Sequence, residues 1–318
     1  MPDRSSAWET VTHHLERVVG VVRRLTGADR SPYHPLFTQG AVLLPRFVFM
    51  VERQEASSLG LPAGHAAIVS NRSSNEKKPW KFQPSMEGIV ESEFLRPTHT
   101  GDALLPYRLA SPLEAVIPCT AQQVLEDSVQ IEAYPGLHRW WSQASEIWEA
   151  NRSSEKLSLM EQLNYQSKLT KQLPIPELRV VYNRSGMHVV AAKLTDRRAI
   201  VTSGLYWMPV YSMQEADYLC AVLNAPTTTD QVRPLMSYGK DERDIAKHIW
   251  ELPIPRFDGA NASHLRLSEL GAALEHRVAA MDLRANRYFA SVRGDVRDLL
   301  EECDDAQEAN ELVFELLG

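Results

Sequence analysis

The sequence lacks the local motifs that identify most classes of enzyme. It has no Gly-x-Gly-x-x-Gly and no Gly-x-x-x-x-Gly-Lys-Ser/Thr loop for phosphates, no Gly-x-Ser-x-Gly nucleophile turn and no His-Glu-x-x-His zinc motif. No two prolines are adjacent, which also excludes an Asn-Pro-Pro-Tyr loop of the kind that adenine methylation uses. We therefore expect no catalytic centre of these types in this chain.

Cysteines and long apolar runs are also scarce. The three cysteines, Cys119, Cys220 and Cys303, are odd in number and far apart, so we expect buried free thiols rather than disulfides or a zinc site. His13 and His14 form the only close histidine pair, and adjacent helical positions point about 100° apart, which suits metal binding poorly. There is no signal peptide and no run of about 18 apolar residues, so we expect no membrane partner and a cytoplasmic location.

The charge is unevenly distributed. The net charge of −7 excludes a uniformly basic coat for nucleic acid. Residues 295–318 carry nine acids and one base, so this tail alone has a charge of −8 and leaves +1 for residues 1–294. Residues 152–198 carry nine bases and four acids, a local charge of +5. A basic surface is therefore compatible with an acidic protein.

Length and composition are those of a globular protein. With 318 residues, of which 44% are hydrophobic and 24% charged, the chain is large enough for about two domains. Hydrophobic patterning predicts an α+β fold with a β-rich N-terminal half, a mixed α/β region and C-terminal helices. We expect an N-terminal helix in 1–30, a β-rich subdomain at 31–135, a mixed subdomain at 136–260, and helices with an acidic tail at 261–318.

Individual elements follow from the same patterns. The predicted strands are residues 40–51, 65–70, 88–94, 124–134, 178–182, 188–194 and 199–201. The predicted helices are residues 5–26, 154–173, 213–223, 241–250, 261–291 and 295–317, with a tryptophan-rich helix that begins at Gly136. Trp140, Trp141 and Trp148 of that helix are expected to form a buried face.

Two basic stretches are the first candidates for nucleic-acid contacts. In the first, Lys77, Lys78 and Lys81 flank Trp80 on a predicted loop, where lysines suit phosphates and tryptophan suits a base. The alternative is a solvated hairpin tip with the indole folded inward. In the second, the predicted helix 154–173 bears a polar face that an ordinary solvated helix also explains. The candidate residues of that face are Tyr165, Lys168, Lys171 and Gln172.

Two further stretches follow. The third is a strand and turn that presents basic and amide side chains, or is a plain hairpin; its candidates are Arg179, Asn183, Arg184 and Ser185. The fourth is the predicted helix 241–250, whose start suits an anion, with candidates Lys240, Arg243 and Lys247. Intrahelical ion pairs with Asp244 are the alternative there. Glu76-Lys77-Lys78 also fits a short nuclease-like pattern of the kind that arises often by chance.

The order of several short motifs resembles one protein family. The motifs are Gln39-Gly-Ala-Val-Leu-Leu-Pro-Arg-Phe47, Gly136-Leu-His-Arg-Trp-Trp141, Leu163-Asn-Tyr-Gln-Ser-Lys-Leu-Thr170, Arg179-Val-Val-Tyr-Asn-Arg-Ser-Gly186, Leu205-Tyr-Trp207, Glu215-Ala-Asp-Tyr-Leu219 with Leu223-Asn224, and Arg243-Asp-Ile-Ala-Lys247 with Leu252-Pro-Ile-Pro255. Over residues 35–280 they are similar to the C-terminal region of adenine-specific (N6) DNA methyltransferases of single-chain restriction-modification and phage-defence systems.

The resemblance implies a target-recognition region that binds double-stranded DNA and reads its sequence. The catalytic half of such enzymes binds S-adenosylmethionine and carries the Asn-Pro-Pro-Tyr loop. This chain lacks both features, so the resemblance implies no cofactor here and a catalytic methyltransferase domain or subunit as partner. Two alternatives stay open: a protein-interaction subunit of a defence complex with no DNA contact, and a hydrolase or nuclease that depends on Glu76.

Overall fold

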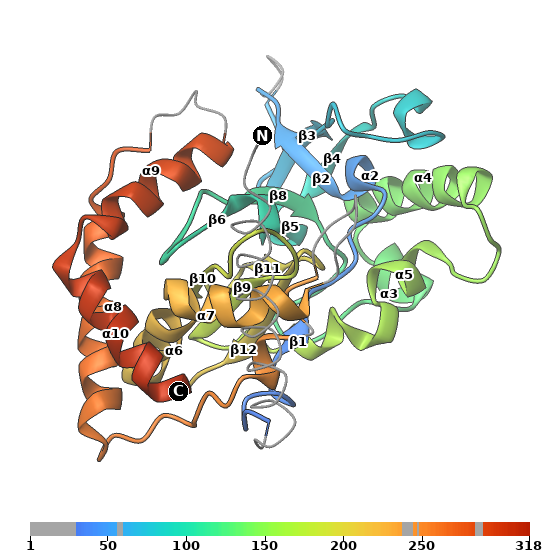
Figure 1. Ribbon diagram of the computed structural model, residues 1–318. Helices are drawn as coiled ribbons and strands as arrows, with labels where there is room; N and C mark the ends of the chain where they lie inside the picture. Colours follow the sequence, from blue (N-terminus) through green and yellow to red (C-terminus); the bar gives the residue numbers. More distant parts are fainter. Residues whose placement is uncertain (1–29, 56–59, 237–243, 247, 284–288) are drawn as a thin grey trace, which may run out of the picture.

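The computed structural model describes residues 30–55, 60–236, 244–246, 248–283 and 289–318 (Figure 1). Two β-sheets lie centrally, with one group of helices on the right of the view and the C-terminal helices on the left. Helix accounts for 42% and strand for 19%, which confirms the expected α+β class. The predicted helix 5–26, within the expected segment 1–30, lies outside the described residues. No described helix combines the length and apolar character that crossing a membrane requires.

The larger sheet has six strands in the order β11-β5-β8-β2-β3-β4, antiparallel except for the parallel pair β11–β5. Side chains alternate between its faces along β3, where Ala66, Ile68 and Ser70 are buried, as the sequence predicts. In chain order the strands are β2 (Met50–Arg53), β3 (His65–Ser70), β4 (Glu87–Glu91), β5 (Leu95–His99), β8 (Leu113–Val116) and β11 (Ile200–Val201).

Helix α4 (Pro135–Asn151) packs against the edge strand β4. Its first turn approaches the sheet closely at Gly136, where a methyl group would lie 2.7 Å from the carbonyl oxygen of Ile89. Glu91 accepts two backbone N–H groups of that turn at 2.9 and 2.8 Å, and so caps a helix that has no acid in its own first turn. This core therefore continues across residue 135, where the sequence places a subdomain boundary.

The tryptophans of α4 face the core of the larger sheet. Trp140 is buried and donates its indole N–H to the carbonyl of Val48 at 3.0 Å. Trp141 and Trp148 are partly buried and pack against the same core. The expected buried face is therefore present, and it leaves the tryptophan-rich helix without an aromatic docking surface.

The smaller sheet has four antiparallel strands in the order β1-β12-β9-β10. They are β1 (Thr38–Gln39), β9 (Arg179–Asn183), β10 (Ala191–Leu194) and β12 (Leu205–Pro209), and a short hairpin of β6 (Leu104–Leu105) and β7 (Arg108–Leu109) lies beside them. The helices on this side are α6 (Met213–Asn224), α7 (Pro226–Val232), α8 (Ala262–Ala279), α9 (Phe289–Glu301) and α10 (Asp304–Leu317).

Helices α6 and α8 pack together closely because Gly271 of α8 has no side chain. A methyl group there would overlap the backbone oxygen of Asp217. The carboxylate of Asp217 pairs with Lys193 of β10, which also pairs with Glu275 of α8 at 2.6 Å. One lysine thus joins the sheet to both helices.

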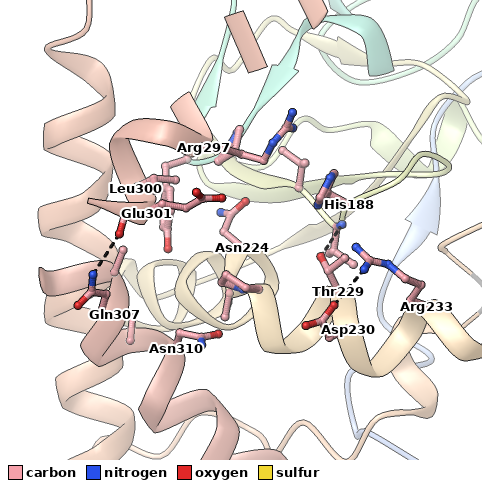
Figure 2. Close-up of a pocket in the computed structure, with 18 residues that line it drawn as sticks. His188, Asn224, Thr229, Asp230, Arg233, Arg297, Leu300, Glu301, Gln307 and Asn310 are labelled. Carbon is pink, nitrogen blue, oxygen red and sulfur yellow. Dashed lines mark hydrogen bonds and ion pairs between the residues drawn. The ribbon is translucent and has the colours of Figure 1, made fainter. Parts of the chain in front are cut away.

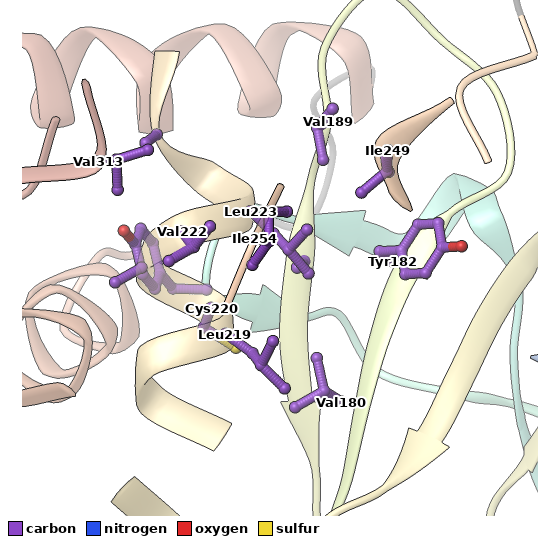
Figure 3. Close-up of a cluster of buried hydrophobic side chains, with 14 of the residues drawn as sticks. Val180, Tyr182, Val189, Leu219, Cys220, Val222, Leu223, Ile249, Ile254 and Val313 are labelled. Atoms are coloured by element: carbon purple, nitrogen blue, oxygen red, sulfur yellow. The ribbon is translucent and has the colours of Figure 1, made fainter. Parts of the chain in front are cut away.

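The core beneath α6 also receives the C-terminal helices (Figure 3). Val180 and Tyr182 of β9 belong to the same buried cluster as Leu219 of α6 and Val313 of α10. Cys220 is part of this cluster, and all three cysteines are buried free thiols, as expected. The acidic tail is therefore folded into the molecule through its apolar side chains.

The two sheets meet at Gly40. The Gly40 N–H donates to the carbonyl of Leu205 at 3.0 Å, and the next N–H donates to Val201 at 2.9 Å. A methyl group on Gly40 would overlap the carbonyl oxygens of Val201 and Thr202. The glycine of the Gln39–Phe47 motif is therefore required by a close backbone approach.

The predicted helix 154–173 is wrong. Asn164 ends the helical segment, because its side-chain oxygen accepts two backbone N–H groups farther along at 3.2 and 3.0 Å. Gln166 and Ser167 then have positive φ angles of 57° and 59°. The segment consists of α5 (Leu159–Leu163) and two 3₁₀ turns, Tyr165–Ser167 and Thr170–Gln172.

Three predicted strands and one predicted helix also differ. Within 124–134, a capping box between Asp127 and Gln130 starts α3 (Ser128–Glu132) instead of a strand. Strand 40–51 is divided by the short helix α2 (Arg46–Phe49), and 88–94 turns into a 3₁₀ helix after Glu91. In the described part of 241–250, Asp244 forms a β-bridge with Ser185, and a 3₁₀ helix spans Ile249–Glu251.

Candidate nucleic-acid interface

Asn183 builds the turn after β9. Its amide nitrogen donates to the carbonyls of Ser185 and His188 at 3.0 and 2.9 Å, and its oxygen accepts the Val190 N–H at 2.9 Å. Gly186 completes the turn with a φ of 145°. Asn183 is itself buried and shapes the turn that places Arg184 and Ser185 at the surface, and its contact with DNA stays a prediction.

Lys168 reaches the same region from the second predicted stretch. Its ammonium donates to the side-chain oxygen of Gln39 at 2.8 Å, and the Gln39 amide donates to the carbonyl of Ser203 at 2.7 Å. The ammonium also lies 5.3 Å from the centre of the Tyr165 ring, which is 43% exposed. Lys168 therefore links an exposed aromatic ring to the strand-and-turn region.

Three of the predicted bases form one positive cluster, defined here as Lys168, Lys171 and Arg184. Burial, and then the charges of Lys171 and Arg184, lower the pKa of Lys168. Lys171 is exposed and Arg184 is half-buried. The fold thus brings together bases that lie on separate motifs of the sequence, and their mutual repulsion favours an anion among them.

A hollow of about 550 Å³ lies next to this cluster. Arg184, Ser185 and Gly186 form one wall, and α2 contributes Arg46 opposite. The charged residues of its lining are Arg46, Arg184, Arg293 and Asp102, so the lining carries an excess of positive charge. The hollow and the cluster together are called the basic groove below.

Arg46 and Arg293 were not among the sequence candidates. Arg46 donates to the side chain of Asn71 at 3.1 Å, while its buried Nε has no hydrogen-bond partner. Arg293 of α9 donates to the carbonyls of Gly101 and Leu104 at 2.7 and 3.0 Å. Arg46 stands in the Gln39–Phe47 motif and was detectable there; no local signal marks Arg293, which stands just before the acidic tail.

Two predicted DNA contacts are corrected by burial. Gln172 is fully buried, and its amide exchanges hydrogen bonds of 2.9 and 2.8 Å with the backbone of Val201. Arg179 is also fully buried; it donates to the carbonyl of Asp196 at 2.8 Å, and burial lowers its pKa to about 10. Neither side chain reaches the surface, so both act within the core that joins the sheets.

The first predicted stretch forms a projecting turn between β3 and β4, called the tip (residues 72–83). Its Trp80 is not available for a base, because it stacks on Trp148 of α4 with ring centres 5.6 Å apart and planes 3° apart. This is the inward-folded alternative for the indole. The three lysines of the tip, Lys77, Lys78 and Lys81, are exposed.

Glu76 serves the structure of the tip and is no candidate for a nuclease. Its carboxylate pairs with Arg72 at 2.6 Å, and its side chain is 7% exposed. In the described parts of the chain, no group of three histidine, cysteine or acidic side chains is arranged to hold a metal ion. The predicted residues of the fourth stretch, Lys240, Arg243 and Lys247, lie outside the described residues.

A second hollow of about 300 Å³ lies between α7, α9 and α10 (Figure 2). Arg233 pairs with Asp230 at 3.2 Å, and Arg297 and Glu301 also line the space, so its formal charges cancel. Burial and the nearby arginines lower the pKa of His188, which favours its neutral form. This hollow therefore lacks the excess positive charge that distinguishes the basic groove.

Comparisons with known proteins give limited similarity. No family model and no curated protein matches the sequence. Among solved structures, the fold is similar to MmeI, a type IIL restriction-modification enzyme solved in complex with DNA, at 13% identity and a TM-score of 0.46 over 70% of this chain and 27% of that one. It is also similar to BpuSI, a type IIG restriction endonuclease, at 14% identity and a TM-score of 0.37 over 96% of this chain and 33% of that one.

The chain thus spans about a third or less of the length of these two structural neighbours. Because both TM-scores lie below 0.5, neither likeness carries an argument about function.

Proposed function

We propose that this chain is the DNA target-recognition region of an adenine-N6 DNA methyltransferase in a restriction-modification or phage-defence system. In this role it binds duplex DNA and positions it for a methyl-transferring domain outside this chain, which would hold S-adenosylmethionine. The observation that carries the proposal is the gathering of Lys168, Lys171 and Arg184 beside a hollow lined by Arg46 and Arg293.

The basic groove suits a phosphate backbone. Its bases come from four separate segments, so only the folded chain produces the positive surface. Lysine and arginine neutralise phosphates and set the register of a duplex, while neighbouring polar groups read base edges. Ser185 and Tyr165 lie beside the bases and supply such groups. Most of the groove is backbone and fixed side chains, which suits positioning better than catalysis.

The alternative of a protein-interaction subunit loses one of its two supports. The tryptophans that would have docked a partner pack against the core. On the acidic helix α10, Glu308 forms two 2.7 Å contacts with Arg266 of α8, so one of the five acids of that helix is paired within the chain.

The test is duplex binding as a function of salt, measured by fluorescence anisotropy. Each phosphate contact contributes about 0.9 to the slope of log affinity against log salt. The variant Lys168→Ala/Lys171→Ala/Arg184→Ala is expected to bind about tenfold or more weakly at low salt, with a slope smaller by about 2 to 3.

The matched control is Arg277→Ala, which removes an exposed base of α8 outside the basic groove. It should change affinity and slope little. The proposal fails if the wild-type chain does not bind duplex at low salt, or if the triple variant and the control bind alike.

A further inference from the structure

The tip is rigid and points its basic side chains outward. Arg72 donates to the carbonyls of Gln83 and Trp80 at 2.8 and 3.1 Å, and its charge is held by Glu76. Gln83 in turn donates to Asn151 at the end of α4 at 2.9 Å. With Trp80 stacked on α4 as well, the tip is fixed at several points although it stands at the edge of the larger sheet.

Phe82 is the exposed aromatic residue of this fixed tip. Its ring is 67% exposed, and the ammonium of Lys78 lies 5.2 Å from its centre. Residues 77–86 contain three lysines and no acid. An apolar ring held among exposed lysines matches the side chains that enter between base pairs while neighbouring charges contact phosphates.

The tip and the basic groove share a support. Arg46, which lines the hollow, donates to Asn71, the residue that immediately precedes the tip. The guanidinium of Arg72 at the base of the tip lies 4.5 Å from the centre of the Phe47 ring in α2. The same short helix thus supports both surfaces.

We infer that Phe82 is a wedge that inserts between base pairs of the duplex and unstacks them, with Lys77, Lys78 and Lys81 on the flanking phosphates. This inference rests on the proposed function, because it needs duplex DNA bound to this chain. It moves the aromatic role from Trp80, the candidate drawn from the sequence, to the residue two positions later. A wedge of this kind would reshape DNA at a step whose base edges the chain does not read.

The test is unwinding of plasmid DNA, which requires no knowledge of the target sequence. A nicked plasmid is sealed by ligase with the full chain bound, freed of protein, and separated into topoisomers. Wild type should shift the distribution of linking number, Phe82→Ala should abolish the shift and weaken binding about tenfold, and Phe82→Tyr should restore both.

Phe314→Ala is the matched control, since it removes a ring that is 61% exposed on the acidic helix α10. Unwinding by Phe82→Ala equal to wild type, or absence of unwinding by a bound wild-type chain, overturns the wedge and leaves the groove standing. Absence of wild-type plasmid binding at low salt overturns the proposed function as well. A third outcome separates the two proposals. If the groove variants bind and unwind DNA normally and Phe82→Ala fails to unwind it, the groove is overturned and the wedge is kept.

Discussion

Trp80 lies flat on Trp148, with ring centres 5.6 Å apart and planes 3° apart, and this stack fixes the tip to α4. The stack determines which aromatic ring of the tip faces solvent. Because the larger indole is occupied, the phenyl ring two residues later is the exposed one.

Trp80→Ala should loosen the tip. We expect faster hydrogen exchange at the amides of Lys81 and Gln83, whose backbone hydrogen bonds hold the turn, and a loss of about 1 to 2 kcal/mol in the free energy of unfolding, since the indole is only partly buried. Val129→Ala removes a side chain that is 67% exposed and serves as the control. Unchanged exchange in the tip would show that the stack does not hold it.

Asn183 and Arg184 should affect DNA binding in different ways. Asn183→Ala removes three hydrogen bonds of the turn but no charge, so binding should weaken several-fold while the salt slope stays at the wild-type value. Arg184→Ala should reduce that slope by about 0.9. Anisotropy titrations at several salt concentrations separate the two. A reduced slope in Asn183→Ala would mean that the turn itself contacts a phosphate.

Buried His99 should make the fold sensitive to acid. Burial, and then the charge of Arg179, lower its pKa to about 4, against about 6.5 in an unfolded chain. As pH falls below 6.5 the unfolded state takes up a proton that the folded state does not, so stability falls. Between pH 7.5 and 4.5 the loss is about 2 to 3 kcal/mol.

Urea unfolding across this range measures the loss of stability, which should be present in wild type and absent in His99→Gln. The control is His138→Gln, which removes an exposed histidine of α4 and leaves the buried one in place. If the stability of wild type and of His99→Gln fell in parallel with pH, the loss could not be attributed to His99.

Two helical glycines should respond to alanine with opposite signs. At Gly271 a methyl group would overlap the backbone of Asp217, so Gly271→Ala should destabilise by about 1 to 3 kcal/mol through separation of α6 and α8. At Gly294 of α9 nothing lies within 4 Å, so Gly294→Ala should stabilise by about 0.5 to 1 kcal/mol. Thermal unfolding of the two variants measures this, and equal shifts of the midpoint temperature would contradict the packing argument.

The fold class, β3 and helix α6 could be predicted because their hydrophobic pattern and their burial agree. The segment 154–173 could not, because Asn164 replaces the next helical turn with side-chain hydrogen bonds that no apolar spacing reveals. Strands β5 and β8 were missed. In β5, the buried Arg96 and the adjacent Pro97 give the strand a composition that resembles a loop.

The candidate site was only partly predictable. Charge marked Lys168, Lys171 and Arg184, and the fold gathers them. Charge also marked Arg179, whose burial depends on the strands that cover it and not on its neighbours in sequence. Arg293 was missed because it reaches the hollow from a segment distant in sequence.

The pairing of β11 with β5 sets a limit on how such chains can be recombined. Ile200 and Val201 complete the sheet built by residues 50–116, although their neighbours in sequence belong to the smaller sheet. A graft cut near residue 135 or 150 would leave the edge at Thr98 and His99 without its neighbour. An exchange of recognition surfaces between related chains must therefore keep residues 50–116 and 200–201 together, or replace nothing larger than the tip and the turn at 183–188.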